Sequence, residues 1–312
     1  MDSLLCDEVW LTTSPTTTIL NHNYGGSFYT TKEDSQQAFD VCLQKEIGYT
    51  PESQYQDHLQ SSGLILARFR AMQWLLKSQR RLNLSCQTVF NAANYFDRFL
   101  SMNQCKGWKY WMVELLAIAC LSVAYKFGET THLPLHEIQM EDLDHSFQSS
   151  LIQRMELTLL KTLGWRLGSV TTYSYIELLM WNFDSLTSFL LGELTTRVTD
   201  LLLSTLSDSK FVEFRPCVVA ISALRCVIQD SLPSPTYNAH LDYVTRLIPE
   251  DQKDDLIKCH KIMEEKMVWP SSPVTVLKME YNWQVDLSLF NKMHGFNVNQ
   301  LKSSKMKRKR EE

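Results

Sequence analysis

The stretch Trp111–Lys126, WMVELLAIACLSVAYK, decides the fold class of this 312-residue chain. Between its first residue and Tyr125, only Glu114 and Ser122 are polar. A helix that is apolar on all sides is buried within a domain instead of lying on its surface. The stretch is shorter than a membrane span requires and contains an acidic residue. We therefore predict that it forms the central helix of a helical domain and that the chain does not cross a membrane.

Lys126, at the end of this stretch, has two interpretations. A lysine at the C-terminus of a buried helix commonly extends its charge into water, where the charge also suits the helix dipole. The other interpretation is that Lys126 binds a partner protein. The helical pattern by itself favours the structural role, and the motifs described below favour the second.

The composition excludes several classes of protein. Glycine (10 residues) and proline (9) are scarce for a turn-rich β protein. The net charge of −4 provides no overall positive field for nucleic acid. The acidic start MDSLLCDE lacks the basic and apolar segments of a signal peptide. The eight cysteines include no C-x-x-C pair, which indicates reduced thiols in an intracellular protein and no zinc site. We expect neither a metal nor a cofactor.

Helical spacing of apolar residues predicts an all-α chain with two tandem five-helix domains. Residues 1–34 are predicted to form a flexible tail, followed by an N-terminal helix over 35–60 that is broken near Thr50-Pro51. The first domain, 61–167, is expected to contain helices at 64–76, 85–100, 111–126, 135–140 and 150–163, with Ser85 and Pro134 as start signals and Gly164 as a stop signal.

The second domain, 168–270, repeats this pattern. Its predicted helices cover 173–181, 186–206, 215–228, 241–248 and 251–268. An offset of 103 residues aligns both Leu115–Leu121 with Val218–Leu224 and Asp97–Ser101 with Asp200–Ser204. One offset that aligns two separate segments indicates two copies of one unit. Residues 271–312 are predicted to form a second flexible tail, which ends in a basic cluster.

Four motifs in the first domain resemble the signatures of the cyclin family. They are Ala67–Leu76, ARFRAMQWLL; Asn94–Leu100, NYFDRFL; Leu121–Phe127, LSVAYKF; and Arg154–Glu156, RME, followed by Leu160 and Leu163. They occur in the order found in cyclins and cover roughly residues 60–167. The L-x-C-x-E motif formed by Leu4, Cys6 and Glu8 is a feature of D-type cyclins. The run RLNLSCQTVFNAANYFDRFLSM, followed by WMVEL, is most similar to plant D-type cyclins, nearest their seventh class.

The resemblance implies a regulatory subunit and not an enzyme. Such a subunit binds and activates a cyclin-dependent kinase as a heterodimer, promotes the G1/S transition and cell division, and directs the kinase to retinoblastoma-type pocket proteins. The residues that match the family's kinase contacts are Lys126, Phe127, Glu156, Trp165 and Leu167. The resemblance also implies a buried ion pair between Arg68 and Asp97, and a substrate-docking patch that includes Arg68 and Trp74.

The chain departs from the family pattern at Gly128 and Gln73, and also at Arg70 and Ala71, where strongly docking cyclins have aliphatic residues. Because Arg70 places a cation beside a site for cationic R-x-L motifs, we expect weak docking. Kinase inhibitors are further partners that the resemblance implies.

The C-terminal cluster has two interpretations, a solvated basic tail or a nuclear-import signal. Its residues are Lys305, Lys307, Arg308, Lys309 and Arg310. We expect a nuclear protein, with the cytoplasm as a further location.

Three other functions are alternatives to a kinase regulator. A metalloenzyme would need clustered ligands, but His132 and His136 flank Pro134 and have no third ligand at metal spacing. A general transcription factor with a cyclin fold would normally need a basic face and often a zinc ribbon. A transcriptional cyclin is the nearest alternative, and the L-x-C-x-E motif argues against it. No contact with nucleic acid is expected.

Overall fold

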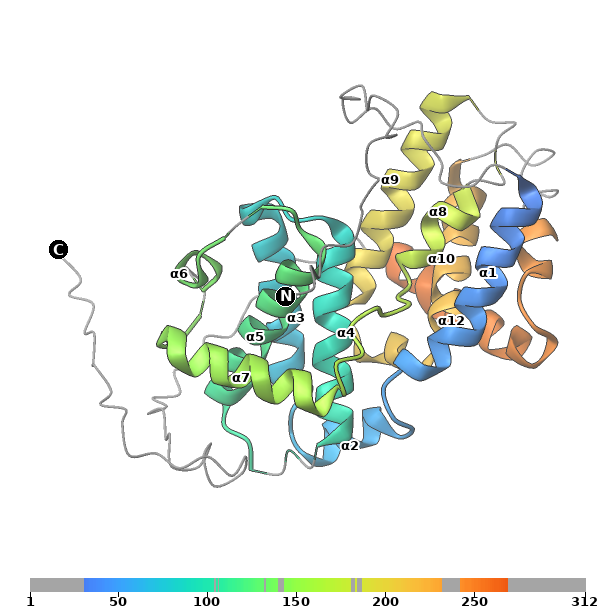
Figure 1. Cartoon of the computed structure of the whole chain (residues 1–312). Coiled ribbons are helices and arrows are strands. Elements are labelled where there is room, and N and C mark those ends of the chain that lie inside the picture. The colour runs from blue at the N-terminus through green and yellow to red at the C-terminus, as the bar shows by residue number, and fades with distance from the viewer. Residues whose placement is uncertain are drawn as a thin grey trace, which may run out of the picture.

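The computed structural model describes residues 31–103, 105, 107–131, 133–139, 143–180, 183, 187–231 and 242–268. Within these ranges every regular element is a helix, which confirms the all-α prediction. The helices form two lobes that lie side by side (Figure 1). The first lobe has its own hydrophobic core centred on the predicted apolar helix, and the second has a separate core.

The first lobe is built around α5, Tyr110–Gly128, in which every side chain from Trp111 to Tyr125 is buried. The lobe's other helices are α3 (Ile65–Leu82), α4 (Cys86–Met102), α6 (Leu135–Ile138) and α7 (Ser149–Thr162). α3, α4 and α7 all pack against α5 and cover its apolar surface. This arrangement explains why α5 has no polar face.

The ends of these helices follow their capping residues. Ser85 precedes α4, and its hydroxyl accepts a hydrogen bond from the backbone N–H of Thr88 at 3.2 Å, as an N-cap does. α3 continues to Leu82, beyond the predicted end at residue 76. Arg81 in its last turn donates to the carbonyl oxygens of Glu137 and Ile138, at 2.8 and 3.0 Å, which joins the end of α3 to α6.

The second lobe repeats the first in its helix positions. Its helices are α8 (Ser174–Met180), α9 (Ser188–Thr205), α10 (Pro216–Ser231), a short segment at 242–246, and α12 (Lys253–Val268). Adding the predicted offset of 103 to the bounds of α4, α5 and α7 gives 189–205, 213–231 and 252–265, close to the bounds of α9, α10 and α12. Like α5, α10 is the most deeply buried helix of its lobe.

The N-terminal segment forms two α-helices, α1 (Lys32–Glu46) and α2 (Tyr55–Ser61), with a short 3-10 helix, η2 (Ile47–Tyr49), between them. α1 begins at Lys32, three residues before the predicted start, because Thr31 and Asp34 form a reciprocal capping box. α1 packs against the second lobe, as Figure 1 shows, although the first lobe follows it in the sequence.

Glu46 at the end of α1 is fully buried and fixes this arrangement. Its carboxylate accepts hydrogen bonds from the Tyr175 hydroxyl at 2.7 Å and the Cys217 backbone N–H at 3.0 Å, and lies 2.7 Å from the Arg215 guanidinium. Burial and the Glu46 charge raise the pKa of the Tyr175 hydroxyl. The phenol therefore stays protonated and donates to the carboxylate.

Among the described residues, α5 is the one helix long and apolar enough to cross a membrane, judged by length and composition alone. Of its apolar window, 83% is buried inside the lobe. The central helix of a folded domain meets the same criteria, so this is weak evidence for a membrane span.

Candidate partner-binding face

Lys126 and Glu156 meet where α5 and α7 pack together. The Lys126 ammonium donates to both carboxylate oxygens of Glu156, at 2.8 and 2.7 Å. The Lys126 side chain is 53% exposed, and that of Glu156 is 10% exposed. An ammonium has three donors. With two used on Glu156, Lys126 is held in one orientation and can offer another hydrogen bond to a partner.

Apolar side chains are exposed on the same two helices and the turn that follows α7. Phe127 is 57% exposed and Trp165 is 65% exposed, and half of Leu157 is accessible. Leu167, in contrast, is partly buried against the core of the first lobe. Large exposed aromatic residues are typical of the energetically important positions in protein interfaces.

Leu157 was not among the residues predicted from the sequence. A signal was available, because this leucine lies outside the spacing of the buried residues Ile152, Met155 and Leu159 on α7. An apolar residue on the polar face of a helix indicates a contact surface when others are exposed near it.

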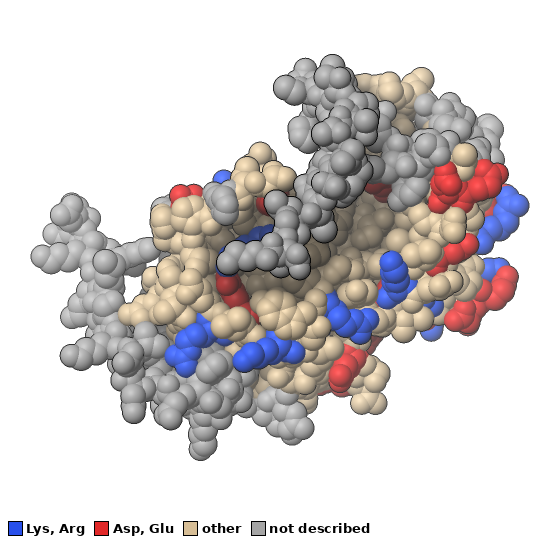
Figure 2. Space-filling view, viewed as in Figure 1, with Lys and Arg blue, Asp and Glu red and all other residues tan. Residues whose placement is uncertain are grey.

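The turn after α7 positions Trp165. Both Gly164 and Trp165 have positive φ, 60° and 61°, and the Trp165 N–H donates to the Leu160 carbonyl at 3.0 Å. A glycine adopts this conformation readily, but a tryptophan does so rarely. Such strain persists where the surrounding structure enforces it and is concentrated at functional sites. On the face that Figure 2 shows, Lys and Arg groups lie across the lower half of the described surface, with a few acidic groups near them and uncharged surface between.

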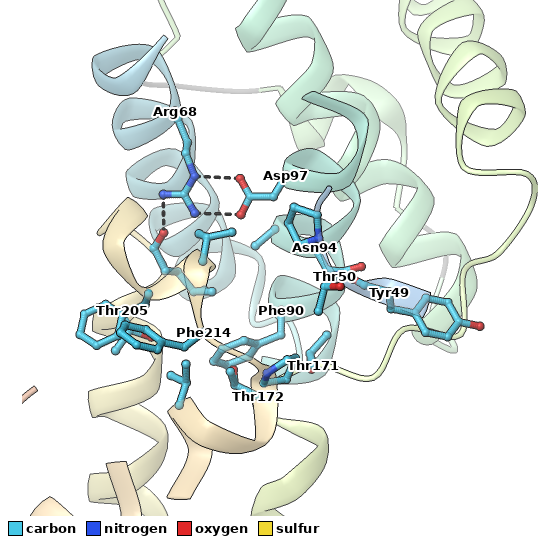
Figure 3. A pocket seen from close by; sticks show the side chains of 17 residues that line it. Tyr49, Thr50, Arg68, Phe90, Asn94, Asp97, Thr171, Thr172, Thr205 and Phe214 are labelled. Carbon is cyan, nitrogen blue, oxygen red and sulfur yellow. Dashed lines mark hydrogen bonds and ion pairs between the residues drawn. The ribbon is translucent and has the colours of Figure 1, made fainter. Parts of the chain in front are cut away.

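Arg68 and Asp97 form the ion pair that the resemblance implied, between α3 and α4 (Figure 3). Arg68 donates to both Asp97 oxygens at 2.8 Å, and the Tyr55 hydroxyl donates to the same carboxylate at 2.8 Å. Burial alone would lower the pKa of Arg68, but the Asp97 carboxylate outweighs this and raises it. Arg68 therefore remains charged inside the protein.

Arg68 also contacts the second lobe. Its remaining nitrogen donates to the Leu206 carbonyl oxygen at 3.1 Å, at the edge of a cavity between the lobes that Figure 3 shows. Gln73 on α3 donates to the Ser207 hydroxyl at 2.7 Å. These two contacts fix one end of α3 against the segment that follows α9.

The residues predicted for substrate docking do not form an exposed patch. Arg68 is only 2% exposed and forms its ion pair with Asp97 inside the protein. Trp74 is 4% exposed because it packs in the core of the first lobe. Arg70 lies over the Tyr110 ring, with its guanidinium carbon 5.2 Å from the ring centre. Substrate docking at Arg68 and Trp74 stays a prediction, and the burial of both side chains agrees with the weak docking that we expect.

Several predicted residues lie outside the described part of the chain. They are the L-x-C-x-E residues Leu4, Cys6 and Glu8, the basic cluster Lys305, Lys307, Arg308, Lys309 and Arg310, and His132. No group of three or more His, Cys, Asp or Glu residues among the described ones is arranged to hold a metal ion.

The two lobes correspond to two matched family domains. Residues 37–168 match the family described as "Cyclin, N-terminal domain", and residues 170–286 match "Cyclin, C-terminal domain". The chain is 32% identical to cyclin-D2-2 of Oryza sativa subsp. japonica over 263 residues, which cover 78% of this chain and 71% of the relative. The chain belongs to the D-type cyclins. Members of this family are regulatory subunits, so the protein is not an enzyme.

Other comparisons extend the assignment of this D-type cyclin. It is 40% identical over 208 residues to a putative cyclin-D7-1, also of Oryza sativa subsp. japonica, in agreement with the predicted class. This match covers 66% of this chain and spans 58% of that relative's length. A solved viral cyclin from herpesvirus saimiri superimposes with a TM-score of 0.55 at 12% identity, covering 76% of this chain and 97% of the viral one. This similarity shows that the fold is the tandem cyclin fold.

Proposed function

We propose that this D-type cyclin binds and activates a cyclin-dependent kinase through the face formed by α5 and α7. The observation that carries the proposal is the Lys126–Glu156 pair, in which the buried Glu156 orients the accessible Lys126 ammonium. The exposed side chains of Phe127, Leu157 and Trp165 accompany it. A charged pair fixes the orientation in which a partner can form hydrogen bonds with the face, and exposed aromatic residues supply the apolar contact that stabilises the complex.

The proposed mechanism is conformational. A cyclin seated on the N-terminal lobe of a kinase pushes the kinase C helix inward, which brings a helix glutamate to the lysine that aligns the ATP phosphates. The cyclin contributes no chemistry to phosphoryl transfer. Its contribution is the binding energy that stabilises the active arrangement of the kinase.

The test is co-expression with candidate cyclin-dependent kinases, followed by affinity capture and an assay on a histone-type substrate. We expect a stable heterodimer and kinase activity that depends on the cyclin. Trp165→Ala should weaken capture, and the control Phe189→Ala should not, because Phe189 is an even more exposed aromatic residue but lies on α9 in the other lobe. Failure of every kinase to be captured would refute the proposal.

Recruitment of a retinoblastoma-type pocket protein is the second part of the proposal and is supported by the N-terminal L-x-C-x-E motif. In an extended chain, residues two apart point the same way, so Leu4, Cys6 and Glu8 share one face. The first two can fill apolar slots while the glutamate accepts hydrogen bonds at the rim. Tethering the substrate in this way raises its local concentration at the kinase and would promote the G1/S transition.

A double variant tests this recruitment. Cys6→Ala with Glu8→Ala should abolish binding to a purified pocket protein but preserve kinase capture and activity on the histone-type substrate. The control is Asp2→Ala with Asp7→Ala, which alters the acidity of the segment but leaves the three motif residues intact. Equal pocket binding by the motif double variant and the wild type would contradict the proposal.

Nuclear localisation is also proposed, on the basis of the C-terminal cluster. Import receptors bind such lysine- and arginine-rich segments through their charge. Replacing Lys307, Arg308, Lys309 and Arg310 with glutamine should shift a fluorescent fusion from the nucleus to the cytoplasm. An unchanged nuclear signal would show that import does not depend on this segment.

The transcription-factor alternative makes a different prediction. Binding to DNA through phosphate contacts would be strongly salt-dependent and would need a basic surface. The net charge of −4 does not favour it. Salt-sensitive retention on DNA without kinase capture would support that alternative.

A further inference from the structure

Two arginines share one aromatic ring at the junction of the N-terminal segment and the first lobe. The guanidinium carbons of Arg98, on α4, and Arg166, after α7, each lie 5.1 Å from the centre of the Tyr49 ring. Arg98 also donates to the carbonyl oxygen of Arg166 at 2.9 Å. Tyr49 ends η2, so the cluster joins three separate segments of the chain.

This cluster lacks the negative charge that accompanies other arginines of the protein. Arg68, Arg197 and Arg215 each pair with a carboxylate. Among the residues that the structure describes, no carboxylate pairs with Arg98 or Arg166. Arg98 is only 1% exposed, and its Nε is buried without a hydrogen-bond partner.

The surroundings of Arg98 and Arg166 favour the binding of an anion. Burial and the neighbouring charge of Arg166 lower the pKa of the Arg98 guanidinium, as expected for cations without an anion nearby. Cation–π contact with Tyr49 compensates for only part of the lost hydration. A buried charge whose partner is missing is costly, so an added anion would be stabilised here more than on an open surface.

Arg166 is the accessible member of the pair. It is exposed, and its side chain passes so close to Gly48 that a Cβ on that residue would lie 2.6 Å from an Arg166 nitrogen. The glycine therefore leaves the space that this guanidinium occupies. Trp165, which precedes Arg166 in the chain, belongs to the proposed kinase face, and Leu167, which follows it, is a predicted kinase contact. Ile47, beside Gly48, is exposed.

We infer that Arg98, Tyr49 and Arg166 form a recognition site for a carboxylate side chain of the partner kinase. Arg166 contacts the carboxylate directly, and the buried Arg98 strengthens the positive potential behind it. The inference rests on the proposed function and deepens it, because it adds a charged contact beyond the Lys126–Glu156 pair and names its chemistry. A guanidinium is suited to this role, since its planar donors match the two oxygens of a carboxylate.

The site also gives the N-terminal segment a role in binding. Tyr49 holds both guanidiniums and is connected through η2 to α1, which is anchored on the second lobe by Glu46. A kinase carboxylate bound at Arg166 would therefore contact the first lobe at a point that the N-terminal segment orders.

Affinity measurements with the captured kinase test the inference. Arg166→Glu should weaken binding at low salt by about tenfold or more and should reduce its salt dependence, because a charged attraction becomes a repulsion. Arg166→Gln should give a smaller loss. Lys258→Glu, the same change of charge at an exposed site on α12, should leave the affinity unchanged. Circular dichroism would verify that each variant is folded.

Cross-linking then identifies the anion. Carbodiimide joins an amine to a carboxylate without a spacer, so Arg166→Lys should form a new cross-link to a kinase aspartate or glutamate that the wild type cannot form. Unchanged affinity in folded Arg166→Glu would overturn the inference while leaving the proposed function intact. Loss of affinity without the new cross-link would overturn the carboxylate assignment. Failure of the wild type to bind any kinase would instead refute the proposed function.

Discussion

Asp97 on α4 accepts two hydrogen bonds from Arg68 on α3, each 2.8 Å long, and this leaves one Arg68 nitrogen to donate to Leu206 in the segment after α9. The pair therefore connects two helices of the first lobe and orients the contact between lobes. Because both side chains are buried, neither charge could be solvated if the other were removed.

Asp97→Ala should for that reason destabilise the protein by about 3–5 kcal/mol, since it leaves the Arg68 charge buried without a partner. The measurement is the free energy of unfolding by denaturant. Asp255→Ala, which removes a half-exposed carboxylate paired with Lys258 on α12, is the control and should cost at most about 1 kcal/mol. An unchanged melting temperature in Asp97→Ala would show that the pair is not needed for stability.

Glu46 should determine whether α1 remains on the second lobe. Glu46→Ala removes a fully buried carboxylate that accepts from Tyr175 and Cys217 and pairs with Arg215. We expect faster amide hydrogen exchange across 32–46 and little change in α5, because the two helices belong to different packed units. Glu33→Ala, an exposed acid at the start of the same helix, should leave exchange unaltered. Equal protection of 32–46 in Glu46→Ala and wild type would contradict this role.

Lys126→Ala and Glu156→Ala should each weaken kinase binding while leaving the helical content intact. Hydrogen bonds to charged groups contribute roughly 1.5–3 kcal/mol, which corresponds to about a tenfold to hundredfold loss of affinity. Calorimetry or surface binding with the captured kinase provides the measurement, and Lys258→Ala serves as the lysine control. Wild-type affinity in both variants would place the kinase elsewhere on the cyclin.

Glu129 should make the stability of the first lobe depend on pH. Its carboxylate accepts from the Thr88 hydroxyl at 2.7 Å and the Ser85 backbone N–H at 2.9 Å, at the start of α4. Burial alone would raise the pKa of Glu129, but these hydrogen bonds outweigh burial and lower it. A lowered pKa means that the carboxylate contributes stability above its unfolded pKa, and that this contribution is lost as pH falls through the folded pKa.

Glu129→Gln tests this dependence because glutamine resembles the protonated acid. The variant should melt at a lower temperature than the wild type at neutral pH, and the difference should shrink as the pH is lowered below the unfolded pKa of the carboxyl group. Glu137→Gln, at a half-exposed site on α6, should show no such trend. A difference that stays constant across the titration would rule out the carboxylate as its source.

Much of the fold was predictable because it depends on local patterns. The apolar run from Trp111 to Tyr125 is buried on every side as α5, since a helix without a polar face is stable only when other helices cover it. Ser85 and Gly164 mark helix ends because capping depends on a few neighbouring residues. The offset of 103 relates the helices of the two lobes because duplicated units keep their spacing.

The candidate site was predictable only in part. The Lys126–Glu156 contact follows from the family motif, but the exposure of Leu157 and the outward position of Trp165 depend on packing. Spacing also did not reveal that Trp74 and Arg68 are covered, since burial depends on helices far away in the sequence.

The sequence by itself determined the helical class, the two repeated units, the central helix and the family. Only the tertiary structure decided that α1 packs against the second lobe through Glu46, that Arg68 reaches Leu206, and that Arg98 and Arg166 meet at Tyr49. The physical reason is the separation along the chain over which each interaction acts. Apolar periodicity and helix capping act over a few residues, whereas a charged side chain takes its partner from whatever the folded chain brings within a few ångströms.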